Sequence, residues 1–129
     1  MSDPAARTVV ILNRDLMFGS KISSAAKIHG LSPRFVRDTA GFDTAIRESG
    51  DSAALGIVDM NGEIDWDLIA ALAADPVITT PLLGFGPHVD VEGRRAAKQA
   101  GLTRILSNGD FHRDTAEMIA RYARTAEEG

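Results

Sequence analysis

The feature of this sequence that most constrains its fold is a regular alternation of short β-rich apolar runs with longer helical patterns. The run TVVIL, from Thr8 to Leu12, begins the series. The run from Ala54 to Asp59 is apolar until its final carboxylate, as expected for a parallel strand buried on both faces. Connections between parallel strands through a helix are right-handed. Five consecutive strand–helix units therefore predict a doubly wound (βα)5 sheet with a flavodoxin-like strand order of 2-1-3-4-5.

The same patterns predict where the elements lie. Strands are predicted at residues 8–12, 32–38, 54–59, 81–85 and 103–106. Helices are predicted at residues 15–29, at a short stretch around Phe42 that ends near Gly50, at residues 66–73 and 91–100, and from about Asp110 onward. We expect the first and fifth helices on one face of the sheet and the other three on the opposite face.

Length and composition indicate the class of protein. The chain has 129 residues, a formal net charge of -4 and no cysteine. We expect one domain over residues 8–124, a flexible tail at 1–7 and a frayed end at 125–129. The basic residues are scattered, which disfavours a nucleic-acid partner. No apolar run reaches the roughly 18 residues of a membrane span, so we expect no membrane partner and a cytoplasmic protein.

Ligands of such sheets bind at the carboxyl ends of the strands, so the strand ends carry the functional prediction. They read LNRD, VRDTA, VDMNG, GFGPH and LSNGD. With the segments PLLGFG and AGLTRIL and the lone Asp59 after the third strand, this order resembles the receiver domain of two-component response regulators, over about residues 8–123. The resemblance implies a CheY-like fold and a role in signal transduction through contacts with other proteins.

The resemblance also implies a phosphorylation pocket, and most of it is missing here. In receivers an acidic pair after strand one binds Mg²⁺, an aspartate after strand three accepts phosphate, a hydroxyl ends strand four and a lysine ends strand five. Of these, only the phosphoacceptor candidate Asp59 survives clearly. The degenerate pocket consists of Asn13 and Arg14 at the acidic pair, Asp15 displaced by one residue, Asn61 after Asp59, Gly86 in place of the hydroxyl, and Asn108 or, with one residue of slip, Ser107 in place of the lysine.

Binding of Mg²⁺ at this pocket is disfavoured. The ion is held by hard oxygen ligands, and the Arg14 guanidinium would place a fixed positive charge beside it. The remaining candidate ligands are Asp15, Asp59 and Asn61, but an aspartate in the position of Asp15 is more often a helix N-terminal residue. We therefore expect no cofactor, leave Mg²⁺ open, and predict that Arg14 forms an ion pair with Asp59 that replaces the metal.

Three functions are compatible with these residues. The leading hypothesis is a stand-alone, atypical receiver that is not an enzyme and binds proteins largely independently of phosphorylation. The alternative is a receiver that accepts phosphate on Asp59 from a histidine kinase through an altered Mg²⁺ site, with autophosphotransfer as its only catalysis. A flavin or nucleotide binder is least favoured, because LNRDLMFGS is no glycine- and hydroxyl-rich phosphate loop. Expected partners are a histidine kinase or a downstream signalling protein, and a homodimer is left open.

The predicted partner surface is the face formed by the fourth helix, the fifth strand and the fifth helix, the usual output surface of receivers. A local excess of positive charge there would steer acidic partners, although interspersed charge is also what an ordinary solvated surface shows. Its basic residues are Arg94, Arg95, Lys98, Arg104 and Arg113.

Overall fold

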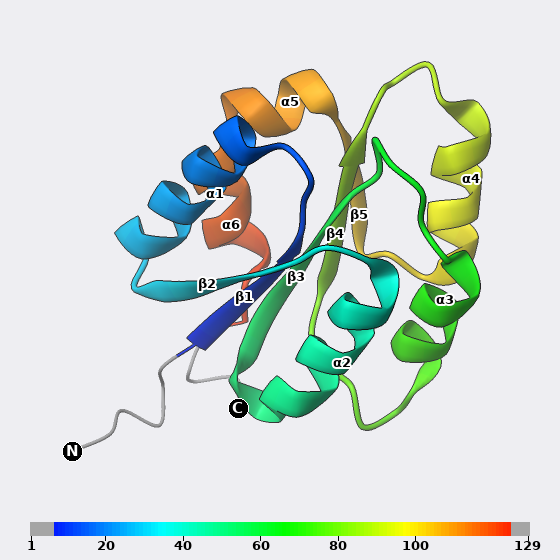
Figure 1. The fold of residues 1–129 in the computed structure, drawn as a ribbon, viewed down its shortest axis with the longest axis horizontal. Coiled ribbons are helices and arrows are strands. Elements are labelled where there is room, and N and C mark those ends of the chain that lie inside the picture. The colour runs from blue at the N-terminus through cyan, green and yellow to red at the C-terminus, as the bar shows by residue number, and fades with distance from the viewer. Residues whose placement is uncertain (1–6, 125–129) are drawn as a thin grey trace.

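The computed structural model describes residues 7–124; the predicted frayed end and all of the predicted tail except Arg7 lie outside the described residues. Five parallel strands form one sheet in the order β2-β1-β3-β4-β5 (Figure 1), which confirms the predicted topology. The strands are β1 (Arg7–Leu12), β2 (Leu31–Val36), β3 (Ala53–Asp59), β4 (Leu82–Gly86) and β5 (Arg104–Ser107).

Helices cover both faces of the sheet, in the predicted division. One face carries α1 (Leu16–Ile28), α5 (Asn108–Arg113) and α6 (Thr115–Tyr122); the other carries α2 (Thr39–Ser49), α3 (Trp66–Ala74) and α4 (Val91–Ala100), with a short 3-10 turn, η1 (Gly50–Ser52), before β3. Each layer has its own buried cluster. Phe18, Phe85 and Phe111 meet in the first, and Phe42, Ile46 and Leu72 lie in the second.

The central strands supply side chains to both clusters. Along β1, Val9 and Ile11 point into the first cluster and Val10 and Leu12 into the second, as the two-residue period of a strand requires. Every residue of β3 is buried. In β3, a Cβ on Gly56 would lie 2.7 Å from the ring of Phe42 and 2.8 Å from Leu82, so the second cluster packs against bare backbone here.

The prediction of a single C-terminal helix was wrong. The structure contains two helices, α5 and α6, with a break at Asp114, whose φ and ψ are -117° and 29°. The Thr115 hydroxyl donates a hydrogen bond of 2.6 Å to the carbonyl of Phe111. A threonine that bonds back to the carbonyl four residues earlier bends a helix, which accounts for the change of direction.

Arg124, which follows α6, is bonded to the amino end of β3. Its guanidinium donates to the carbonyls of Asp51 at 3.0 Å and Ala53 at 2.7 Å.

Within residues 7–124 no helix has both the length and the apolar character needed to cross a membrane.

Candidate functional site

The candidate site lies at the carboxyl end of β3, where Asp59 is held by its own turn. The residue is only 4% exposed. Its Oδ1 accepts hydrogen bonds from the backbone N of Asn61 at 2.9 Å and from the Asn61 side-chain Nδ2 at 2.7 Å. An aspartate that bonds the backbone two residues ahead closes an Asx turn, which holds the carboxylate in one orientation.

A pair of amides connects this turn to the start of α5. Asn61 Nδ2 donates to Asn108 Oδ1 at 3.0 Å, and Asn108 Nδ2 donates to Asn61 Oδ1 at 2.9 Å, across 47 residues of sequence. Asn108 is the first residue of α5, and Ser107 caps the helix by accepting from the backbone N of Asp110 at 3.1 Å. The structure thus joins Asp59, Asn61 and Asn108 in one network, and Asn108 is one of the two candidates, with Ser107, for the position that the resemblance gives to a lysine.

The end of β4 carries no hydroxyl, and its space is filled by another side chain. Gly86 is buried and pairs with Ser107 of β5. A Cβ added at Gly86 would lie 3.0 Å from the Cβ of Met60, which is tighter than an ordinary contact. Met60 is itself held by a hydrogen bond of 2.8 Å from its backbone N to the carbonyl of Phe85. A serine or threonine at position 86 therefore requires Met60 to move.

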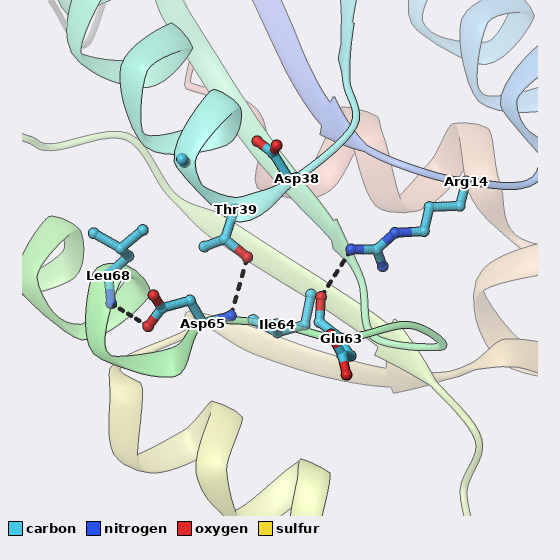
Figure 2. A pocket seen from close by; sticks show the side chains of 8 residues that line it. Arg14, Asp38, Thr39, Glu63, Ile64, Asp65 and Leu68 are labelled. Atoms are coloured by element: carbon cyan, nitrogen blue, oxygen red, sulfur yellow. Dashed lines mark hydrogen bonds between the residues drawn. The ribbon is translucent and has the colours of Figure 1, made fainter.

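The predicted ion pair between Arg14 and Asp59 is wrong. The Arg14 side chain crosses to the loop after β3, where Nη2 donates to the carbonyl of Glu63 at 2.8 Å (Figure 2). Its guanidinium passes so close to Gly62 that a Cβ there would lie 2.0 Å from Nη1. Within residues 7–124 no ion pair joins Arg14 to Asp59. A backbone carbonyl gives the cation a hydrogen bond without the desolvation of a second charge.

Asn13 and Asp15 are also bonded to backbone groups. Asp15 caps α1, because its Oδ1 accepts from the backbone N of Met17 at 3.0 Å and of Phe18 at 3.2 Å. Asn13 Nδ2 donates to the backbone carbonyl of Asp15 at 2.7 Å. The interpretation of Asp15 as a helix N-terminal residue is confirmed.

The donor set at this edge does not fit Mg²⁺. The ion takes near-octahedral oxygen ligands. Here Asp15 is turned toward its own helix, one oxygen of Asp59 is occupied by Asn61, and the side-chain oxygen of Asn61 accepts from Asn108. Among residues 7–124, no three acidic, histidine or cysteine side chains lie close enough together to hold a metal ion.

Comparison with known proteins identifies the fold. No family model matches the sequence, and no curated protein matches it. Similar solved structures include the chemotaxis protein CheY4 of Vibrio cholerae, with 14% identity, a TM-score of 0.72 and coverage of 91% of this chain and 98% of that one. The chain has the receiver fold. A response regulator protein from Burkholderia multivorans is 22% identical, with a TM-score of 0.72 and coverage of 90% and 94%. HP1043, an orphan response regulator of H. pylori, is 12% identical, with a TM-score of 0.69 and coverage of 92% and 95%.

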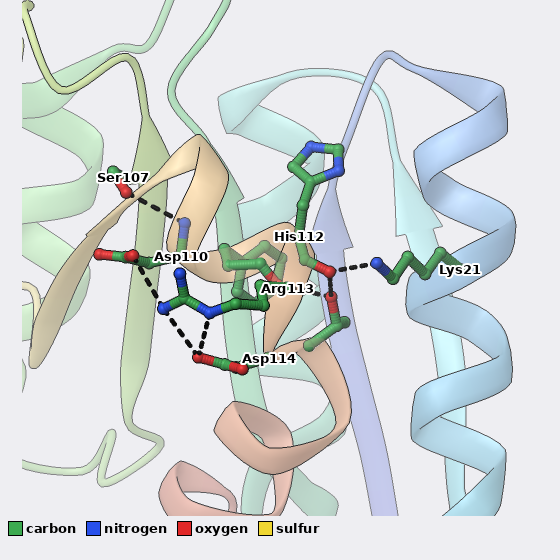
Figure 3. A network of polar contacts seen from close by, with 8 residues as sticks. Lys21, Ser107, Asp110, His112, Arg113 and Asp114 are labelled. Carbon is green, nitrogen blue, oxygen red and sulfur yellow. Dashed lines mark hydrogen bonds and ion pairs between the residues drawn. The ribbon is translucent and has the colours of Figure 1, made fainter.

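The receiver fold that the strand ends predicted is therefore confirmed. The fold also places α5 firmly against α1, a contact that the sequence analysis missed. The His112 ring stacks on Phe18 with ring centroids 3.5 Å apart and planes 10° apart, and Lys21 Nζ donates to the His112 carbonyl (Figure 3). Figure 1 shows α5 beside the first turn of α1. Asn61 and α1 thus hold α5 from two sides.

The predicted partner face of this receiver fold is less positive than its composition indicates. Arg113 donates to Asp110 at 3.0 Å and to Asp114 at 3.2 Å (Figure 3). The hydrogen bond to Asp114 and the charge of that carboxylate, followed by those of Asp110, raise the pKa of Arg113. Arg94 is half-buried. The basic residues of this face that are exposed and in no ion pair within residues 7–124 are Arg95, Lys98 and Arg104.

A cavity of about 610 Å³ beside Arg14 was also missed. Two of the acids that line it serve as helix caps: Asp38 accepts from Gly41 N at 2.7 Å, and Asp65 accepts from Asp67 N at 3.1 Å. The sequence signal was an aspartate before each of two helices. The third acid, Glu63, accepts from Arg14 through its backbone carbonyl (Figure 2).

Proposed function

We propose that the chain is a protein-binding module of receiver fold whose output does not depend on phosphorylation of Asp59. The observation that carries the proposal is the reciprocal amide pair between Asn61 and Asn108, at 2.9 and 3.0 Å. In receivers the lysine bonds the phosphoryl group and biases the output face. Here a direct hydrogen-bonded link connects the turn of Asp59 to α5 without any phosphoryl group.

The groups around Asp59 support the same proposal. A carboxylate attacks a phosphodonor only when cations offset the donor's negative charge. No ammonium ends β5, the Arg14 guanidinium is bonded to Glu63, and the end of β4 offers only Gly86. A phosphoryl group on Asp59 would therefore meet two neutral amides in place of the lysine.

The proposed output surface is the face of α4, β5 and α5. Arg95, Lys98 and Arg104 are exposed there, and they would speed the association of an acidic partner protein. The phosphorylatable alternative is retained as an outcome of the test, because Asp59 does end a buried strand at the carboxyl edge of the sheet.

The test compares three variants in binding to a protein that co-purifies with the chain in stoichiometric amount. Replacing Arg95 and Lys98 with Glu should lower the association rate constant about tenfold, with an unchanged melting temperature. Asp59→Asn should leave the association rate constant unchanged. Replacement of Lys27 and Arg37 with Glu is the charge-matched control on another surface, and it should have little effect.

If Asp59→Asn abolishes partner binding while the change at Arg95 and Lys98 does nothing, the proposal fails. The phosphorylatable receiver then takes its place. An equal fall in the association rate constant for the Arg95 and Lys98 variant and for the control would also contradict the proposal. It would show that association depends on the net charge of the protein and not on this face.

A further inference from the structure

A second cavity, of about 650 Å³, lies between α1 and the edge strand β2, away from the Asp59 network. Its volume falls within the range of small-molecule sites. Among the described residues, no acidic side chain lines it, whereas two cations and several serine hydroxyls do, in a chain whose net charge is -4. This cavity, called the groove below, is therefore positively charged, although the protein as a whole is negatively charged.

The two cations are Lys27, in the last turn of α1, and Arg37, directly after β2. Both are exposed, and neither is in an ion pair within the described part of the chain. Lys27 is also favoured at its position by the negative end of the helix dipole, whereas Arg37 has no such reason to be there. Arg37 is therefore the stronger evidence for an anion site. Together they favour an anion in the groove.

One polar group that lines the groove lacks a partner. Asn13 Nδ2 donates to the carbonyl of Asp15, which can only accept, so the orientation of the amide is determined. Asn13 Oδ1 is then buried without a hydrogen bond from any described residue. Buried acceptors nearly always have a donor. A small tilt of the amide would present Oδ1 to a hydroxyl or N–H group in the groove.

An aromatic ring and a missing side chain complete the groove. Phe35 on β2 is 44% exposed and lines the groove with an apolar surface. Gly19 on α1 lets the Asn13 amide and the Phe35 ring come close to the helix: a Cβ there would lie 2.7 Å from Asn13 Nδ2 and 3.4 Å from Phe35 Cε1. An apolar ring packs well against an exposed aromatic face.

We propose that this groove binds a small organic anion that carries an apolar ring and one hydrogen-bond donor. Lys27 and Arg37 take the anionic group, Phe35 packs on the ring, and Asn13 accepts from the donor. The site is separate from the Asp59 network and from the proposed partner face, so it stands whether or not the proposed function holds.

The experiment is an NMR titration of the ¹⁵N-labelled full chain with 4-hydroxybenzoate, which has all three features. A fragment of this size should bind with a Kd on the order of 1 mM. Saturable shifts should be confined to amides of residues 19–27 and 35–37 and to the Asn13 side chain. The neutral analogue 4-hydroxybenzyl alcohol should bind about tenfold more weakly, because it lacks the charge-assisted contacts. Absence of saturable shifts, shifts elsewhere, or equal binding of the two probes would overturn the proposal.

Variants separate groove binding from adsorption to a positive surface. Replacing Lys27 and Arg37 with Gln should weaken binding about tenfold, whereas the same change at Arg95 and Lys98 should not. Gly19→Ala keeps both cations, but its Cβ would push the Asn13 amide out of place, so it should also weaken binding; circular dichroism and thermal unfolding verify that the variant is folded. Undiminished binding to Gly19→Ala, or equal losses in the two Gln variants, would sink the groove assignment.

Discussion

The two sides of the carboxyl edge of the sheet use their polar residues differently. On the β3 and β5 side, Asp59, Asn61 and Asn108 bond to one another and so connect segments 47 residues apart. On the β1 side, Asn13, Arg14 and Asp15 each bond to a backbone group instead. The first arrangement determines how α5 sits relative to β3, whereas the second stabilises only a helix start and a loop. On the proposed function, the residues at the positions that the resemblance gives to the metal ligands are dispersed, and Asn61 and Asn108 form a structural link.

The largest expected effect comes from restoring the strand-four hydroxyl. Gly86→Thr should lower the free energy of unfolding by about 1–3 kcal/mol, because its Cβ would crowd Met60 in a packed layer. Urea denaturation measures the loss. Gly109→Ala is the matched control: its Cβ would meet nothing within 4 Å, so no loss is expected. A stable Gly86→Thr variant would show that Met60 yields and that the hydroxyl position is still available.

The amide link should appear as a coupling energy. In a double-mutant cycle, Asn61→Ala and Asn108→Ala should couple by about 0.5–1.5 kcal/mol, the net value of a hydrogen-bonded pair. The same cycle between Arg14→Ala and Asn108→Ala should be additive, because their side chains share no bond. Additivity of the first cycle would remove the contrast between the two sides of the edge.

Asp15 should behave as a helix cap and not as a metal ligand. Asp15→Ala should lower the free energy of unfolding by about 1 kcal/mol, and Asp15→Asn by a few tenths of that, because asparagine also caps helices. Thermal unfolding with and without Mg²⁺ tests whether Asp15 is a metal ligand. A rise in wild-type melting temperature with Mg²⁺ that Asp15→Asn removes would contradict it.

Arg14 should give the smallest effect. Arg14→Gln loses one exposed hydrogen bond to a carbonyl, so the free energy of unfolding should fall by less than about 1 kcal/mol. The loss should be the same at low and high salt, because no ion pair is broken. A loss that high salt abolishes would indicate that Arg14 and Asp59 interact in solution.

The fold could be predicted from sequence because its signals are local. The helix at residues 91–100 was predicted with the correct bounds. Its end could be predicted because Gly101 stops it in a left-handed conformation, at a φ of 99°. The five strands and their order followed from the same alternation. The break at Asp114 was missed because it depends on how Thr115 bonds backward and on how His112 docks against Phe18.

The site could be predicted only in part. The interpretation of Asp15 was right, because a cap depends on the next three residues alone. Arg14 was assigned to Asp59 because charges are visible in a sequence, whereas the carbonyl of Glu63 that it binds is not. Asn61 and Asn108 were both placed in the pocket, but their mutual bonding requires coordinates.

We propose that the Asp59 network is a structural link and not a phosphorylation site. The most direct measurement is a titration with Mg²⁺ followed by beryllofluoride, which mimics a phosphoryl group, with the side-chain amide resonances of Asn61 and Asn108 observed by NMR. We expect both resonances to stay in place at every concentration. Saturable, Mg²⁺-dependent movement of both resonances, absent in Asp59→Asn, would show that the network opens to a phosphoryl group and that Asp59 is a phosphorylation site.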